Sequence, residues 1–158
     1  MKKIVYLDST IPNYLYDQRD SIRNFIDITN QWWQEERENY HLVSSEAMLV
    51  ELSRGEYPHK ERILEECLPL VEILPFDQRI DEIVEVYETN YLMPKASMGD
   101  GTHLAYASLY KSDFLLTWNC NHIANANKMH HIRVINTRLG LFVPEIITPL
   151  ELFKETDS

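Results

Sequence analysis

Short apolar runs alternate with amphipathic segments along the whole of this 158-residue chain. The segments expected to be extended are residues 3–8, 41–43, 71–74, 114–117, 132–135 and 143–149. Helices are expected at 20–38, 44–53, 58–67, 77–91, 100–111 and 121–131, with a turn at 11–13 and a loop at 94–99. Strands that alternate with helices imply a mostly parallel sheet covered on both faces. The predicted fold class is therefore α/β, with one domain over residues 1–158.

Composition limits where such a chain works. The apolar share of 44% argues against disorder, and no apolar run approaches the roughly 20 residues of a membrane-spanning helix. The first apolar stretch is too short for a signal peptide. The two cysteines, Cys67 and Cys120, belong to no Cys-x-x-Cys pair and are expected to be reduced thiols. These features predict a cytoplasmic protein without a membrane anchor.

Polar residues stand at matching places in several of these segments. Asp8 closes the first apolar run, and Asn119 follows the run that begins at residue 114. Glu51 lies in an apolar helical stretch, and Asp100 opens another. In an α/β chain such positions converge at the carboxyl edge of the sheet, and gathered carboxylates repel one another unless a cation joins them. Oxygen ligands favour Mg²⁺ or Mn²⁺, which predicts a metal-dependent phosphodiesterase.

Glu46 competes with Glu51 for the second acidic position. The two residues are five apart, so on a helix they point about 140° away from each other. Glu46 directly follows Ser44 and Ser45, where an acid stabilises the first turn of a helix. Glu51 stands in mid-helix, where no cap is needed. We therefore prefer Glu51 as the ligand and leave a site role for Glu46 open.

Histidine and tryptophan residues near these positions have two interpretations. His103 follows Asp100 by about one turn, so it either contacts a substrate phosphate or is a satisfied, half-buried histidine. His122 lacks the Cys and His partners that a zinc site requires. Trp118, beside Asn119, is the tryptophan best placed to lie near a substrate. The other two, Trp32 and Trp33, are expected in the core or at a dimer interface.

Taken in order, several motifs resemble those of the PIN-domain nucleases, in particular the bacterial VapC-like proteins. The matching segments are residues 6–11, 45–55, 100–105, 115–125 and 146–152, which together extend over nearly the whole chain. The resemblance implies a three-layer α/β/α PIN-like fold, a site for Mg²⁺ or Mn²⁺, and endoribonuclease activity on RNA. It also implies a toxin restrained by a cognate antitoxin, and a homodimer.

Carried over residue by residue, the resemblance assigns the site. Asp8, Glu51 and Asp100 match the first three acids of the family and would be the metal ligands. Asn119 stands where many relatives have a fourth Asp, and Thr117 matches the hydroxyl residue two places before it. Asn119 and Thr117 would position water or a ligand carboxylate.

Two other functions stay open. The formal net charge of −10 argues against a broad basic surface for nucleic acid. Together with Asn119, it favours a catalytically weak PIN-like regulator that binds RNA or protein. A metal phosphohydrolase of small substrates is the third possibility, although the chain has no Gly-rich phosphate loop.

Overall fold

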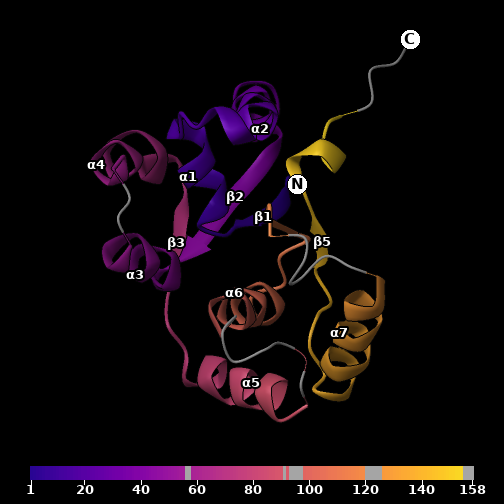
Figure 1. The fold of residues 1–158 in the computed structure, drawn as a ribbon. Helices are drawn as coiled ribbons and strands as arrows, with labels where there is room; N and C mark the ends of the chain where they lie inside the picture. Colours follow the sequence, from indigo (N-terminus) through magenta and orange to yellow (C-terminus); the bar gives the residue numbers. More distant parts are fainter. Residues whose placement is uncertain (56–57, 91, 93–97, 120–125, 155–158) are drawn as a thin grey trace.

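The computed structural model describes residues 1–55, 58–90, 92, 98–119 and 126–154 (Figure 1). Within them, five parallel strands form one sheet in the order β3-β2-β1-β4-β5. The strands are β1 (Lys3–Leu7), β2 (Tyr40–Ser45), β3 (Glu72–Leu74), β4 (Phe114–Leu116) and β5 (Glu145–Ile147). The order runs outward from β1 in both directions, so β1 and β4 flank a topological switch point, where α/β proteins bind ligands. The predicted α/β class with a parallel sheet is confirmed.

Helices cover both faces of this sheet. They are α1 (Thr10–Tyr16), α2 (Arg23–Glu36), α3 (Glu46–Arg54), α4 (Lys60–Arg62), α5 (Gln78–Thr89), α6 (Met98–Leu109) and α7 (Ala126–Arg138). A π-helical turn extends α4 over Ile63–Cys67, and 3-10 turns cover Asp20–Ile22, Arg37–Asn39, Leu68–Leu70 and Pro149–Glu151. Figure 1 shows α5, α6 and α7 on one side of the sheet and α1 and α2 on the other. None of the helices in the described ranges is long and apolar enough to cross a membrane.

The side chains of the central strand alternate between two cores, as a strand buried on both faces requires. Tyr6 packs in the core formed with α5, α6 and α7. Val5 and Leu7 pack in the opposite core, which includes residues of α1, α2 and α3. Strand β1 therefore contributes side chains to both cores, and Asp8 directly follows this strand.

The turn expected at residues 11–13 is wrong, because these residues lie inside α1. Pro12 is the third residue of that helix, where a missing N–H is tolerated because first-turn N–H groups have no acceptor within the helix. Ile11 and Leu15 are four residues apart and both buried, so the helix presents one apolar face to the core.

The strand expected at residues 132–135 is also wrong, because the segment belongs to α7. Ile132 and Ile135 are buried, while Arg133 between them is exposed. A spacing of three residues fits one face of a helix, whereas a strand would bury alternate residues. The helix is followed by Gly140, whose positive φ of 69° places it in the left-handed region typical after a helix end.

Other expectations are confirmed to within a few residues. The Ser45 hydroxyl accepts a hydrogen bond from the Ala47 amide at 3.2 Å, which makes Ser45 the N-cap of α3 as its position indicates. The amphipathic helix expected at 77–91 is α5, and the strand expected at 114–117 is β4. Most of the loop at 94–99, the first part of the helix expected at 121–131, and both Cys120 and His122 lie outside the described residues.

Cys67 supplies a test of the core next to α1 and α3. Its side chain is 1% exposed, and burial raises the pKa of its thiol to about 12. Because the thiolate is the reactive form, Cys67 is expected to resist a thiol reagent in the native protein at neutral pH and to react in urea. Mass spectrometry on the Cys120→Ser variant, which retains one thiol, measures this. Rapid labelling of that native variant would show that the segment around Cys67 opens readily.

Candidate functional site

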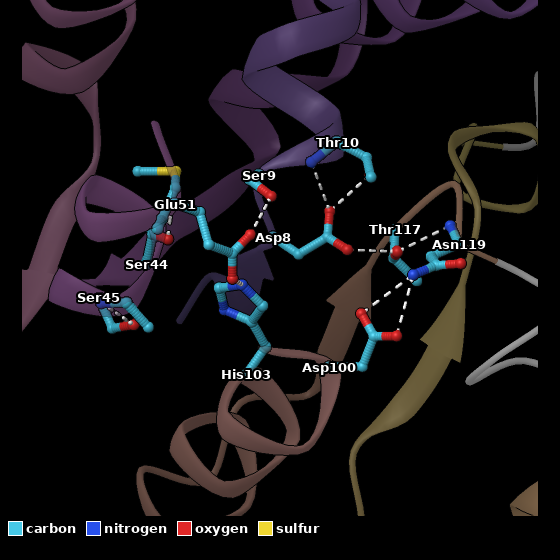
Figure 2. Close-up of polar contacts among 12 residues, drawn as sticks. Asp8, Ser9, Thr10, Ser44, Ser45, Glu51, Asp100, His103, Thr117 and Asn119 are labelled. Carbon is cyan, nitrogen blue, oxygen red and sulfur yellow. Dashed lines mark hydrogen bonds and ion pairs between the residues drawn. The ribbon is translucent and has the colours of Figure 1, made fainter. Parts of the chain in front are cut away.

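Asp8 directly follows β1 at the switch point and is 2% exposed. Its Oδ1 accepts hydrogen bonds from the Thr10 amide at 3.0 Å and the Thr10 hydroxyl at 2.5 Å, and its Oδ2 accepts one from the Thr117 hydroxyl (Figure 2). Burial raises the pKa of Asp8 above its ordinary value, while the charge of His103 and the hydroxyl donors partly offset this shift. Both oxygens of Asp8 are thus held by residues from two neighbouring strand ends.

The segment after β4 is joined to the same carboxylate. Thr117 is fully buried, and its hydroxyl oxygen accepts a hydrogen bond from the Asn119 amide at 2.9 Å. The Trp118 amide donates to the Thr10 hydroxyl at 3.0 Å. Two hydroxyl groups therefore fix both the orientation of Asp8 and the path of residues 117–119. The Thr117 hydroxyl thus contacts Asp8, one of the carboxylates expected to bind the metal.

Asp100 lies in the first turn of α6 and is paired with Asn119. The Asn119 side-chain nitrogen lies 3.0 Å from one Asp100 oxygen and 2.9 Å from the other, and donates to the carboxylate. An Asp in place of Asn119 would bring two like charges to this separation, which is unfavourable without a cation between them. Asn119 thus orients Asp100 and adds no charge.

The carboxylate of Glu51, on α3, accepts two hydrogen bonds. The Ser9 hydroxyl donates to its Oε2 at 2.5 Å, and the His103 Nε2 lies 2.6 Å from its Oε1. Burial opposes the ionisation of Glu51, but the hydrogen bond and charge of His103 together with Ser9 outweigh it and lower the pKa. A Cβ at Gly99 would lie 3.0 Å from Oε1, so the absence of a side chain there lets the first turn of α6 approach Glu51.

His103 connects this acid to the core. It is 1% exposed, and its Nδ1 lies 2.7 Å from the Tyr6 hydroxyl, which in turn lies 2.6 Å from the Ser45 hydroxyl. Burial lowers the pKa of His103, but the hydrogen bond to Glu51 and the charges of Glu51, Asp8 and Asp100 raise it overall. With both ring nitrogens engaged, His103 is the satisfied histidine of the two sequence interpretations and is not free to contact a substrate phosphate.

Several residues of this network were not assigned from the sequence. Tyr6, Ser9, Thr10 and Ser45 all contribute hydroxyl groups, and three of them lie within two positions of Asp8 in the sequence. That cluster of hydroxyl residues around one strand-end acid is a usable signal. The link from Tyr6 to His103 spans 97 positions and depends on the packing of α6 against β1, which no local pattern reveals.

The structure places Glu46 and Glu51 in different surroundings. Glu46 is exposed in the first turn of α3, directly after the N-cap Ser45, where an acid interacts favourably with the helix dipole. Glu51 instead reaches His103 and Ser9. The 140° separation expected for these positions, an approximate value from helix geometry, agrees with their different surroundings.

The tryptophan residues divide as expected. Trp32 is fully buried and Trp33 is 9% exposed, and both belong to the core beside α1 and α3. Trp118 is half-buried at the end of β4, between Thr117 and Asn119. It is therefore the tryptophan that lies next to the site acids.

The donor set agrees in chemical type with a hard divalent cation, since carboxylate oxygens are the ligands that Mg²⁺ and Mn²⁺ prefer. In Figure 2, Asp8 lies between the Glu51–His103 pair and the Asp100–Asn119 pair. Among the residues that the structure describes, however, no three His, Cys, Asp or Glu side chains converge closely enough to hold an ion. Each acid has hydrogen-bond partners of its own: Asp8 has Thr10 and Thr117, Glu51 has Ser9 and His103, and Asp100 has Asn119.

A cavity of about 770 Å³ lies elsewhere, along α1 and α2, and none of the three acids lines it. Its charged lining residues are Asp17, Arg23, Asp27, Arg37, Arg62 and Glu66. The lining thus contains three charged residues of each sign, and it is separate from the acids at the switch point.

The comparisons with known proteins bear on the fold. No protein-family model matches the chain, and no curated protein is similar to it in sequence. Solved structures do match. One is a chain of a toxin–antitoxin complex from Klebsiella pneumoniae, with a TM-score of 0.59 and 18% identity over 92% of this chain and 97% of that chain.

A second match is a chain of VapBC2 from Rickettsia felis, in a structure bound to a DNA fragment from the promoter. Its TM-score is 0.54 and its identity 14%, over 92% of this chain and 98% of that chain. The chain has a PIN-like fold. The resemblance to VapC-like proteins is thus confirmed at the level of the fold, and identities this low say nothing of activity, substrate or partner.

The Glu51–His103 pair predicts how the stability of the metal-free PIN-like protein depends on pH. The pKa of His103 is raised in the folded state above its ordinary value of 6.5. The contribution of His103 to the free energy of unfolding is therefore complete below pH 6.5 and is lost as pH rises through the raised pKa. Chemical denaturation in EDTA is expected to show a free energy of unfolding that falls as pH rises from 6.5 through the raised pKa. The His103→Gln variant, which keeps a donor but not the charge, is expected to show a shallower fall. Equal pH dependence of the two proteins would contradict the charged pair.

The Asn119–Asp100 pair gives a second prediction. Asn119→Asp replaces a donor with a like charge, so the metal-free protein is expected to lose about 1–3 kcal/mol of unfolding free energy. Mn²⁺ is expected to raise the melting temperature of this variant more than that of the wild type. Asn39→Asp is the matched control, because Asn39 donates to Glu36 at 3.0 Å away from the site. Rescue of both variants by Mn²⁺, or of neither, would argue against a cation between residues 100 and 119.

Proposed function

We propose that this chain is a metal-dependent endoribonuclease, which hydrolyses RNA phosphodiester bonds as a VapC-like toxin. The observation that carries the proposal is the set of three acids from β1, α3 and α6 around the switch point, where Asp8 lies between the other two. Thr117 and Asn119, from the end of β4, hold two of these acids through hydrogen bonds. The PIN-like fold adds support, since matching chains occur in toxin–antitoxin complexes.

In this proposal Asp8, Glu51 and Asp100 hold Mg²⁺ or Mn²⁺. When bound, such an ion supplies hydroxide at neutral pH, neutralises the scissile phosphate and stabilises the leaving oxygen. The chain's own residues set the geometry: Thr10 and Thr117 fix the two oxygens of Asp8, and Asn119 fixes those of Asp100. His103 and Ser9 hold Glu51, and partners of this kind contribute about 10- to 100-fold to metal affinity or activity.

The remaining parts of the proposal concern partners and location. We propose a cognate antitoxin that restrains the nuclease, a homodimer, and a cytoplasmic location. The excess of 25 acidic over 15 basic residues supports a partner that carries positive charge, because opposite charges steer two proteins together.

A second candidate function is a catalytically weak regulator that binds RNA or protein. The Asn119–Asp100 pair favours it, since an amide stands where a fourth acid would add charge for a metal. Tight Mn²⁺ binding without cleavage of RNA would support this candidate over the nuclease.

The decisive test is cleavage of a mixed RNA pool by the purified chain with Mn²⁺ or Mg²⁺, with EDTA as the metal-free control. Asp100→Asn is expected to abolish cleavage and to leave the fold intact, because it removes a ligand charge and no core packing. Glu46→Gln is the matched control: it also neutralises one acid, but at an exposed position, and is expected to cleave like the wild type. Unchanged cleavage by Asp100→Asn would contradict the assignment.

A further inference from the structure

Three aromatic rings from three different segments contact one another, and one of them belongs to Trp118, which lies between Thr117 and Asn119. The Tyr14 and Trp118 rings are stacked, with centroids 6.2 Å apart and an interplanar angle of 17°. The Phe25 ring also contacts the Trp118 ring; their centroids are 4.8 Å apart and their planes are tilted by 53°. Tyr14 belongs to α1, Phe25 to α2, and Trp118 follows β4. We call these three residues the aromatic cluster.

Hydrogen bonds fix this cluster to the carboxylate site. The Trp118 amide donates to the Thr10 hydroxyl, which itself donates to Asp8, so the backbone of Trp118 is one hydroxyl group away from the acid. The indole N–H donates to the buried Thr29 hydroxyl at 2.7 Å, and Thr29 donates to the Phe25 carbonyl at 2.6 Å. The polar edge of the indole is therefore satisfied inside the protein.

The cluster is only partly covered. Phe25 is 42% exposed, and Tyr14 and Trp118 are half-buried. A set of rings that served the core alone would be expected to bury its members, as the core buries Trp32. An exposed ring near a phosphodiesterase site can bind a nucleobase, because every nucleobase has a flat face that stacks on aromatic side chains.

The charge of the chain gives an independent reason for such contacts. Proteins that bind RNA through phosphates do so with Lys and Arg, and here 25 acidic residues outnumber 15 basic ones. With this excess of negative charge, contacts that do not depend on charge gain importance for binding RNA. Stacking of bases on aromatic rings is such a contact.

We propose that Phe25 and Trp118, supported by Tyr14, form a stacking site for an unpaired nucleobase next to the scissile bond. This inference rests on the proposed endoribonuclease function for its substrate class. It requires that this base be unpaired, because a paired base cannot offer its face to a protein ring. It also assigns specificity to the cluster, since larger bases stack more extensively.

Phe25→Leu tests the site with little risk to the fold, because the side chain is exposed and leucine keeps an apolar group there. Phe142→Leu is the matched control: Phe142 is 39% exposed and precedes β5, at the amino ends of the strands, whereas Trp118 follows the carboxyl end of β4. Both changes are made in an Asp100→Asn background, so that bound RNA stays intact. Trp118→Phe, which keeps a ring, and Trp118→Leu, which does not, form a second pair.

The measurement is fluorescence anisotropy of a labelled single-stranded RNA of mixed sequence, with and without a single abasic residue moved along the strand. Phe25→Leu is expected to weaken binding about tenfold, which is about 1.4 kcal/mol, and Phe142→Leu to leave it unchanged. An abasic residue at one position is expected to weaken binding to the Phe25-containing protein and to have little further effect on Phe25→Leu, because the two changes remove the same contact.

The outcomes separate this inference from the proposed function. Equal affinities of Phe25→Leu and Phe142→Leu, or no binding of single-stranded RNA, would overturn the stacking site even if the wild type cleaves RNA. Loss of affinity confined to Phe25→Leu and Trp118→Leu would establish the site even if the wild type cleaves nothing, and would then favour the RNA-binding regulator. Retained binding by Trp118→Phe supports stacking over a purely structural role of the indole.

Discussion

The burial of Asp8 is the constraint on which the rest of the site depends. A carboxyl group that is 2% exposed at the end of the central strand is unfavourable unless hydrogen bonds satisfy its oxygens. Thr10 and Thr117 supply those bonds from the segments that follow β1 and β4. The same two hydroxyl groups accept the amides of Trp118 and Asn119. Satisfying one buried acid therefore joins the two strand ends at the switch point and shapes the chain around them.

The other two acids are held by different partners, and the difference is electrostatic. Glu51 faces His103, whose raised pKa reflects the negative charges around it, and each lowers the energy of the other's charged form. Asp100 faces a neutral amide, which fixes its orientation without balancing its charge. The site thus contains one internal ion pair, between Glu51 and His103.

Local sequence patterns predict some helices and strands of this chain correctly and others wrongly. The alternation of strands and helices, the Ser45 cap of α3 and the amphipathic α5 follow from spacing and capping, which are local. The run of residues 132–135 misleads, because four consecutive residues of mixed character fit a strand and a helix equally well until burial selects one face. The first turn of α1 misleads for a similar reason, since Pro12 suggests a turn and is equally compatible with a helix start.

The sequence by itself determined the α/β class, the positions of Asp8, Glu51, Asp100, Thr117 and Asn119 at strand ends and on helices, and an acidic chain that lacks a broad basic surface. Tertiary structure alone decided that His103 is buried between Tyr6 and Glu51, that Asn119 pairs with Asp100, and that Phe25 lies on Trp118. These contacts join residues 19 to 97 positions apart. Spacing fixes which face of an element a residue occupies, but which faces meet depends on how β1, α2, α3 and α6 pack against one another.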